Sequence, residues 1–153
     1  MGEFVLGLIK GGGLSTGEDL KQLPAELYTA EQVREMDRIA IEELGISGFS
    51  LMMQAGCVAF NLVECCYPTA RKLHVFCGSG NNGGDGFVVA SEALNKGFRV
   101  VVFLLGPVSS ITGDARLALD AYVLSGGAIK TPLLEPIMAC DVVIDALFGT
   151  GLS

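Results

Sequence analysis

The hydrophobic pattern between residues 73 and 146 alternates between strand-like and helix-like segments. Apolar, β-branched runs at 73–77, 99–105 and 141–146 predict buried strands. Between them, segments 85–96 and 113–125 have helical periodicity, and each is followed by a glycine that can end a helix. This alternation predicts a Rossmann-like α/β fold, in which a parallel sheet has helices on both faces and forms the middle of three layers.

Two further helices are predicted before the first strand. Thr29 and Gln32 have capping-box spacing, and apolar residues follow at intervals of three and four up to Gly45. A second helix is predicted over 50–66, which has a broad apolar face and ends before Pro68. We therefore expect one domain over 28–153.

The two ends of the chain differ from this regular pattern. Residues 1–27 are rich in glycine and polar side chains, which predicts a flexible leader outside the fold. The last five residues, 149–153, follow directly on a predicted strand, where a finished sheet would normally continue. We therefore expect a domain that is truncated at its C-terminus.

Composition narrows the class of protein. The 153 residues are 50% hydrophobic and 18% charged, as in one compact domain, and the formal charge of −7 disfavours binding to nucleic acid. The longest apolar runs that we identify, 4–9 and 100–105, are too short to cross a bilayer, so no membrane association is expected. Five cysteines, an odd number without paired spacing, suit free thiols in a reducing, cytoplasmic setting.

A glycine-rich segment follows the first predicted strand of the sheet. Its sequence, Gly78 to Gly83, matches G-x-G-x-x-G between a strand and a helix, where glycines and a helix N-terminus can hold an anion. The next strand ends without the acidic residue that binds the ribose in dehydrogenases, since residues 103–106 are Phe-Leu-Leu-Gly. The alternative is a tight turn without a ligand, because Asn and Gly are ordinary turn residues.

Side chains with oxygen atoms gather at two predicted strand ends. Asn81, Asn82 and Asp85 follow the first strand, and Asp145 lies at the end of a later strand, before a second glycine-rich loop. Ligands of open α/β sheets bind outside the carboxyl ends of strands, and oxygen atoms are suitable ligands for a hard cation. The alternative for Asp145 is a helix cap or turn former. The single histidine, His74, is expected to be a buried structural residue.

Three segments resemble the YjeF N-terminal domain family, the NAD(P)H-hydrate epimerases. They are GSGNNGGDG at 78–86, VIDALFGTGL at 143–152 and LYTAEQ at 27–32. The resemblance implies a Rossmann-like homodimer that interconverts the R and S epimers of hydrated NADH and NADPH (NADHX and NADPHX). It also implies a functional partner, an NAD(P)H-hydrate dehydratase that is either fused or separate and that restores the coenzyme.

The resemblance also implies roles for individual residues. Potassium would be held by Asn82 and Asp145. Asp145 is also a candidate for proton transfer, although a carboxylate neutralised by potassium is a poor base. The family's Asp-x-Pro-Ser-Gly segment is not found in these 153 residues. Two alternatives to an active epimerase therefore stay open: a noncatalytic binding or dimerisation module, or an inactive truncated fragment. The hydrated nucleotide would be bound by Asn81, Asn82, Gly83, Gly84, Asp85, Gly149, Thr150, Gly151, Leu152 and Ser153.

Overall fold

The structure is a computed structural model that describes residues 9–10, 28–131 and 139–149. Its five-stranded sheet has the order β1-β5-β2-β3-β4. The strands are β1 (Ile9–Lys10), β2 (Lys72–Cys77), β3 (Arg99–Leu104), β4 (Ile129–Lys130) and β5 (Val142–Ala146). The helices are α1 (Ala30–Glu42), α2 (Gly48–Cys66), α3 (Asn81–Asn95) and α4 (Gly113–Leu124), with a short 3-10 turn at Val108–Ser110.

The four strands from β5 to β4 are parallel, and β1 pairs with β5 in the antiparallel direction. Val75 of β2 lies opposite Val102 of β3 on one side and Ile144 of β5 on the other. All three side chains are buried, as expected of central strands in a parallel sheet. The arrangement confirms the predicted Rossmann-like α/β fold.

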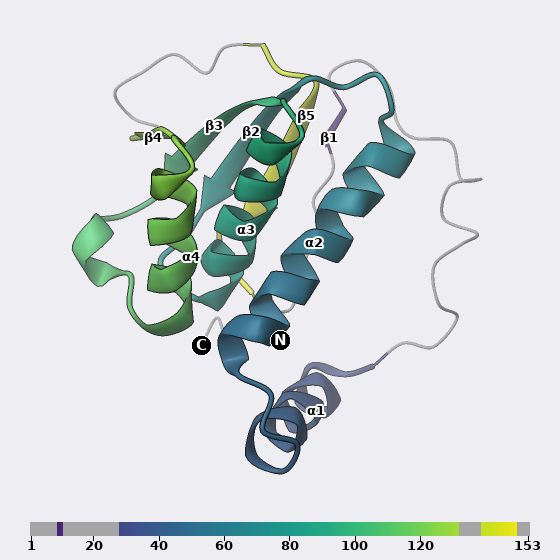
Figure 1. The fold of residues 1–153 in the computed structure, drawn as a ribbon, viewed down its shortest axis with the longest axis vertical. Helices are drawn as coiled ribbons and strands as arrows, with labels where there is room; N and C mark the ends of the chain where they lie inside the picture. The colour runs from purple at the N-terminus through teal and green to yellow at the C-terminus, as the bar shows by residue number, and fades with distance from the viewer. Residues whose placement is uncertain (1–8, 11–27, 132–138, 150–153) are drawn as a thin grey trace.

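Helices α2, α3 and α4 lie side by side over one face of the sheet, and α1 lies apart, beside the start of α2 (Figure 1). Alternate residues of β2, among them Leu73, Val75 and Cys77, are buried in the main core together with Phe87 and Val89 of α3. Among the described residues, these three helices form the layer that covers this face of the sheet. Because α3 packs directly on β2, β3 and β5, its first turn lies at the carboxyl edge of the sheet.

The opposite face of β2 and β3 carries an aromatic cluster. The ring of Phe103 stacks on Phe76 with centroids 4.9 Å apart, and it meets His74 edge-on at 5.3 Å. His74 is buried, and its burial, together with the charge of Lys130, lowers its pKa. The expectation of a buried histidine is therefore confirmed, and its position lies across the sheet from α3.

The structure corrects two predictions, one about residues 1–27 and one about the start of α3. The short strand β1 falls within the segment expected to be a leader outside the fold, yet it pairs with Val142 and Val143 of β5. The remaining residues of 1–27 lie outside the described residues. Helix α3 begins at Asn81, four residues before the predicted start at 85. The prediction was too late because Asn and Gly have low helix propensity, whereas tertiary packing holds this first turn in a helix.

Helix α2 is longer than the apolar runs on which the membrane argument from the sequence was based. It has 19 residues, a mean hydropathy of 1.4 over an 18-residue window, and enough length and apolar character to cross a membrane by those two criteria. Ser50, Gln54 and Asn61 interrupt the apolar pattern along this helix, which the sequence predicts over 50–66. A third of that window is buried inside the molecule, including Phe60 and Val63 of the main core.

Candidate functional site

The start of α3 is packed so closely that its glycines cannot be replaced without displacing neighbours. A Cβ atom on Gly86 would lie 2.6 Å from the Cβ of Ala146 in β5. One on Gly84 would lie 2.6 Å from the Sδ of Met52 in α2 and 2.9 Å from the Cα of Ala115 in α4. The first two turns of α3 are therefore held between β5, α2 and α4.

The three glycines of the G-x-G-x-x-G segment do different things. A Cβ on Gly78 would overlap the carbonyl oxygen of Leu147, and a Cβ on Gly83 would overlap the carbonyl oxygen of Gly78. These two glycines are thus needed for packing at the strand ends. Gly80 differs, because a Cβ there meets no atom of the described residues within 4 Å. The space in front of Gly80 is open, as a binding site for a ligand requires.

Gly80 is also the N-cap residue of α3, and it provides no side-chain hydrogen bond to the first turn. Thr29 and Ser47, by contrast, cap α1 and α2 with their side-chain oxygens. The first backbone N–H groups of a helix have no partner within the helix, and they carry partial positive charge. The uncapped start of α3 can therefore accept an anionic group such as a phosphate.

Two polar side chains are buried behind this helix start. Asn82 is 6% exposed and Asp85 is 0% exposed. Neither the Nδ2 atom of Asn82 nor the two carboxyl oxygens of Asp85 find a hydrogen-bond partner in the part of the chain that the structure describes. The pKa of Asp85 is raised to about 7, mainly by burial, with a smaller contribution in the same direction from the like charge of Asp37 on α1. Since buried polar groups are normally hydrogen-bonded, these atoms indicate a place for a ligand.

The predicted ligand Asp145 lies differently from Asn82. It is exposed near the end of β5, and its Oδ1 accepts a hydrogen bond of 3.0 Å from the N–H of Leu147. The next residue, Ala146, faces Gly86 of α3. Because side chains alternate along a strand, Asp145 points to the other face of the sheet. Both residues lie at the carboxyl edge of the sheet, where Asn82 is buried in the first turn of α3 and Asp145 is exposed at the end of β5.

The other predicted site residues have mixed positions. Asn81 is exposed at the first residue of α3, whereas Gly83 and Gly84 are buried by the neighbouring strands and helices. Gly149 is half-buried in the turn after β5. Four predicted contacts, Thr150, Gly151, Leu152 and Ser153, lie outside the described residues.

Residues 48–153 match the family model described as "YjeF-related protein N-terminus". This chain belongs to that family. The match includes α2, the whole parallel sheet, α3 and α4. The resemblance that rested on three short segments is therefore confirmed over more than half of the chain.

Curated relatives of this YjeF-related domain carry related names. One, the "Bifunctional NAD(P)H-hydrate repair enzyme Nnr" of Coxiella burnetii, is 42% identical over 128 residues, which are 83% of this chain and 26% of that protein. Another, the "NAD(P)H-hydrate epimerase" of Rhodobacter capsulatus, is 34% identical over 135 residues, which are 84% of this chain and 64% of that protein. The chain thus spans about a quarter of the bifunctional relative and under two thirds of the epimerase.

A solved structure supports the fold independently. The crystal structure of a yeast protein superposes with a TM-score of 0.70 at 23% sequence identity, covering 84% of this chain and 58% of the yeast chain. At that identity, the likeness shows that the two proteins share a fold.

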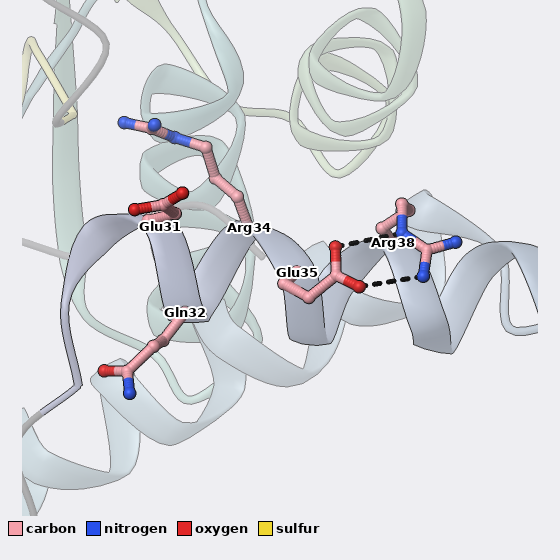
Figure 2. A pocket seen from close by; sticks show the side chains of 5 residues that line it. All are labelled: Glu31, Gln32, Arg34, Glu35 and Arg38. Atoms are coloured by element: carbon pink, nitrogen blue, oxygen red, sulfur yellow. Dashed lines mark hydrogen bonds and ion pairs between the residues drawn. The ribbon is translucent and has the colours of Figure 1, made fainter.

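A hollow lies along α1, away from the start of α3, and Figure 2 shows the side chains that line it. The guanidinium of Arg38 donates to Glu35 and to Glu42 at 2.8 Å each, and these pairs raise the pKa of Arg38. A cation already shared between carboxylates is a poor site for a phosphate. The lining residues are Glu31, Gln32, Arg34, Glu35 and Arg38.

Sequence reasoning missed the residues that surround the start of α3 from other elements. Asp37 was not predicted as a site residue, although it follows Val33 by four residues and so shares its half-buried face. Met52 and Gly56 of α2 were not predicted as neighbours of this helix start either. A Cβ on Gly56 would meet the carbonyl oxygen of Asp85 at 3.2 Å. A glycine inside an apolar helix was the available signal for this close approach.

Proposed function

We propose that this chain is an NAD(P)H-hydrate epimerase, which interconverts the R and S epimers of hydrated NADH and NADPH. The observation that carries the proposal is the start of α3, where Asn82 and Asp85 lie behind an uncapped helix N-terminus. Both are buried, and each has polar atoms without a hydrogen-bond partner in the described part of the chain. Open space at Gly80 and the helix amides suit the pyrophosphate of a nucleotide. The names of the relatives from Coxiella and Rhodobacter support the choice of reaction.

The substrate contacts that we propose are the residues inherited from the family resemblance. They include Asn81 at the helix start and Gly149 after β5, two segments that lie at the same edge of the sheet. Ligands of open α/β sheets bind at this edge. The proposed set is Asn81, Asn82, Gly83, Gly84, Asp85, Gly149, Thr150, Gly151, Leu152 and Ser153.

We propose potassium as the cofactor, with Asn82 and Asp145 as ligands. Amide and carboxylate oxygens are the donors that hard cations prefer, and the hydrogen bond from Leu147 to Asp145 fixes that carboxylate at the strand end. The two side chains supply part of an oxygen shell. Because a monovalent ion is a weak Lewis acid, potassium would supply positive charge that organises the glycine loops and the pyrophosphate.

The proposed assembly is a homodimer that works with an NAD(P)H-hydrate dehydratase, fused or separate, in the cytoplasm. Apolar side chains after α1 and on α2 support self-association, since Leu44 is 69% exposed and Val58 is 68% exposed. Sedimentation equilibrium checks this part of the proposal. Twice the mass of 16.0 kDa is expected, and a monomer at all concentrations would contradict it.

The activity is tested by coupling. The purified chain is mixed with both epimers of hydrated NADH, an S-specific dehydratase and its nucleotide, in potassium or sodium buffer, and the recovery of NADH is followed. We expect complete recovery, faster in potassium than in sodium. Recovery that stops at the S fraction and continues only at the spontaneous rate would contradict the proposal, and would favour a noncatalytic binding module or an inactive fragment.

A further inference from the structure

One side of helix α2 is open to solvent from the beginning of the helix to its end. The exposed residues recur at intervals of four, four, three and four, which places them on a single side of the helix. They extend over about 22 Å of the axis, at a rise of 1.5 Å per residue. We call this surface the outer strip of α2, and it consists of Ser50, Gln54, Val58, Asn61 and Cys65.

The outer strip of α2 carries no charged side chain, in contrast to the exposed sides of two other helices. Arg38 of α1 and Arg116 of α4 each pair with an exposed carboxylate. The charged residue of α2, Glu64, is half-buried beside the strip, and its Oε2 lies 3.6 Å from the Nζ of Lys96. Depletion of charged residues marks the centre of protein–protein interfaces, so the strip has the composition of a docking surface.

The absence of charge also indicates which partner the strip fits. The chain has a formal charge of −7, so two copies repel each other through most of their surfaces. In a twofold dimer the same patch meets itself, and any charge within it would face its own sign. A neutral strip avoids this repulsion, whereas an acidic or basic partner would find no opposite charge on it. The strip therefore fits a second copy of this chain.

The order of residues along the strip is self-complementary. Val58 lies near the middle of α2, and Gln54 and Asn61 lie at similar distances on either side of that point. Two copies of α2 packed antiparallel would bring Gln54 of one against Asn61 of the other. Their side-chain amides can donate and accept hydrogen bonds in pairs. Val58, which is 68% exposed in one copy, would be buried against its counterpart.

We propose that the outer strip of α2 is the surface on which a second copy of this chain docks, with the two α2 helices antiparallel and a twofold axis near Val58. The inference rests on the homodimer within the proposed function, and it assigns the interface that holds this dimer together. The same arrangement places Ser50 of each copy opposite Cys65 of the other.

The opposite side of α2 holds the start of α3. A Cβ on Gly84 of α3 would lie 2.6 Å from the Sδ of Met52, and a Cβ on Gly56 of α2 would meet the carbonyl oxygen of Asp85 at 3.2 Å. Helix α2 thus lies between the proposed interface and the candidate site. A second copy docked on the outer strip supports α3 from behind and leaves the space in front of Gly80 open.

The first test is sedimentation equilibrium of the full chain and two variants, with circular dichroism to compare their helix content. Val58→Glu places like charges on both sides of the twofold axis, and we expect the dimer Kd to rise at least about 100-fold. The matched control is Val123→Glu on α4, where the native side chain is 49% exposed. It adds the same charge away from the strip, and should leave the Kd within about threefold of the unsubstituted chain.

The second test is a cross-link that depends on the antiparallel register. Ser50→Cys places a thiol opposite the exposed native Cys65 of the second copy. A disulfide needs Cα atoms within about 7 Å of each other, which two closely packed helices provide at this position. With diamide as the oxidant, we expect a band of twice the chain mass on a non-reducing gel. The band should be absent from the double variant Ser50→Cys with Cys65→Ser.

The outcomes separate the interface from the proposed function. A monomer at all concentrations, a dimer whose Kd is unaffected by Val58→Glu, or a dimer that Ser50→Cys does not cross-link would overturn the interface. Each of these results leaves the epimerase activity to the coupled assay. If the dimer dissociates and cross-links as expected, but NADH recovery does not exceed the spontaneous rate, the interface stands and the proposed function fails.

Discussion

Helix α1 and the first turns of α3 treat their polar groups in opposite ways. In α1, Thr29 and Gln32 form a reciprocal capping box, and Arg38 on its exposed face pairs with three glutamates. In α3, the cap residue is a glycine without a side chain. Behind it, the Nδ2 atom of Asn82 and both carboxyl oxygens of Asp85 are buried without a hydrogen-bond partner among the described residues.

Helix α1 thus pairs its polar groups through nearby side chains, whereas the start of α3 has no side-chain cap and contains buried polar atoms without partners among the described residues. An isolated buried carboxyl group costs stability, and it persists where function requires it. We therefore interpret the start of α3 as a site maintained for a ligand, and α1 as a support that can be altered without loss of chemistry. Four substitutions test this contrast.

The largest expected effect comes from Asp85→Asn at high pH. The folded-state pKa of about 7 lies above the ordinary value of 3.8, so the carboxyl group favours folding below pH 3.8 and loses that contribution as pH rises through 7. At pH 8 the substitution should therefore raise the free energy of unfolding by up to about 4 kcal/mol.

Urea unfolding at pH 4 and pH 8 measures this effect. The gain should shrink towards zero at pH 4, where the native carboxyl group is already neutral. A substitution that destabilises the protein equally at both pH values would show that Asp85 is an ordinary structural residue.

A pair of glycine substitutions in one segment gives the second effect. Gly83→Ala should lower the free energy of unfolding by about 3 kcal/mol, because its Cβ overlaps the carbonyl oxygen of Gly78. Gly80→Ala should leave stability nearly unchanged, since its Cβ would lie more than 4 Å from every atom that the structure describes. It should weaken nucleotide binding by filling the open space. Thermal unfolding with and without NADPH measures both, and equal stability losses would contradict the packing described.

The smallest effect is expected in α1. Thr29→Ala removes the oxygen that accepts from the N–H of Gln32 at 3.2 Å, and should cost about 1 kcal/mol, with no change in epimerase rate. Thr29→Ser, which retains the hydroxyl, serves as the control in the same urea titration. A loss of activity in Thr29→Ala at a temperature where the protein stays folded would contradict the view of α1 as a support.

The sequence predicted best those elements that depend on residues close to one another in the chain. The capping box of Thr29 and the apolar strands at 73–77 and 141–146 depend on neighbouring residues, and the structure confirms them within one residue. The start of α3 depends on distant residues such as Met52 and Ala115, which hold Gly84 in a helix. Propensity alone therefore placed that start four residues too late.

The candidate site was predictable in composition but not in arrangement. Spacing and the carboxyl-edge rule selected Asn82, Asp85 and Asp145 correctly as groups at one edge of the sheet. Which side chain is buried depends on the neighbours of α3 and on strand alternation, both of which need the three-dimensional structure. Asp85 is buried for that reason, and Asp145 is exposed.

Amide hydrogen exchange with bound nucleotide tests the central claim most directly. The chain is compared with and without a mixture of both epimers of hydrated NADPH, in potassium buffer, and exchange is followed along α1, the segment 78–95 and the turn after β5. We predict that the nucleotide slows exchange at the start of α3 and in the turn after β5, while α1 is unchanged. Protection confined to α1, or no protection of α3 at saturating nucleotide, would contradict the account.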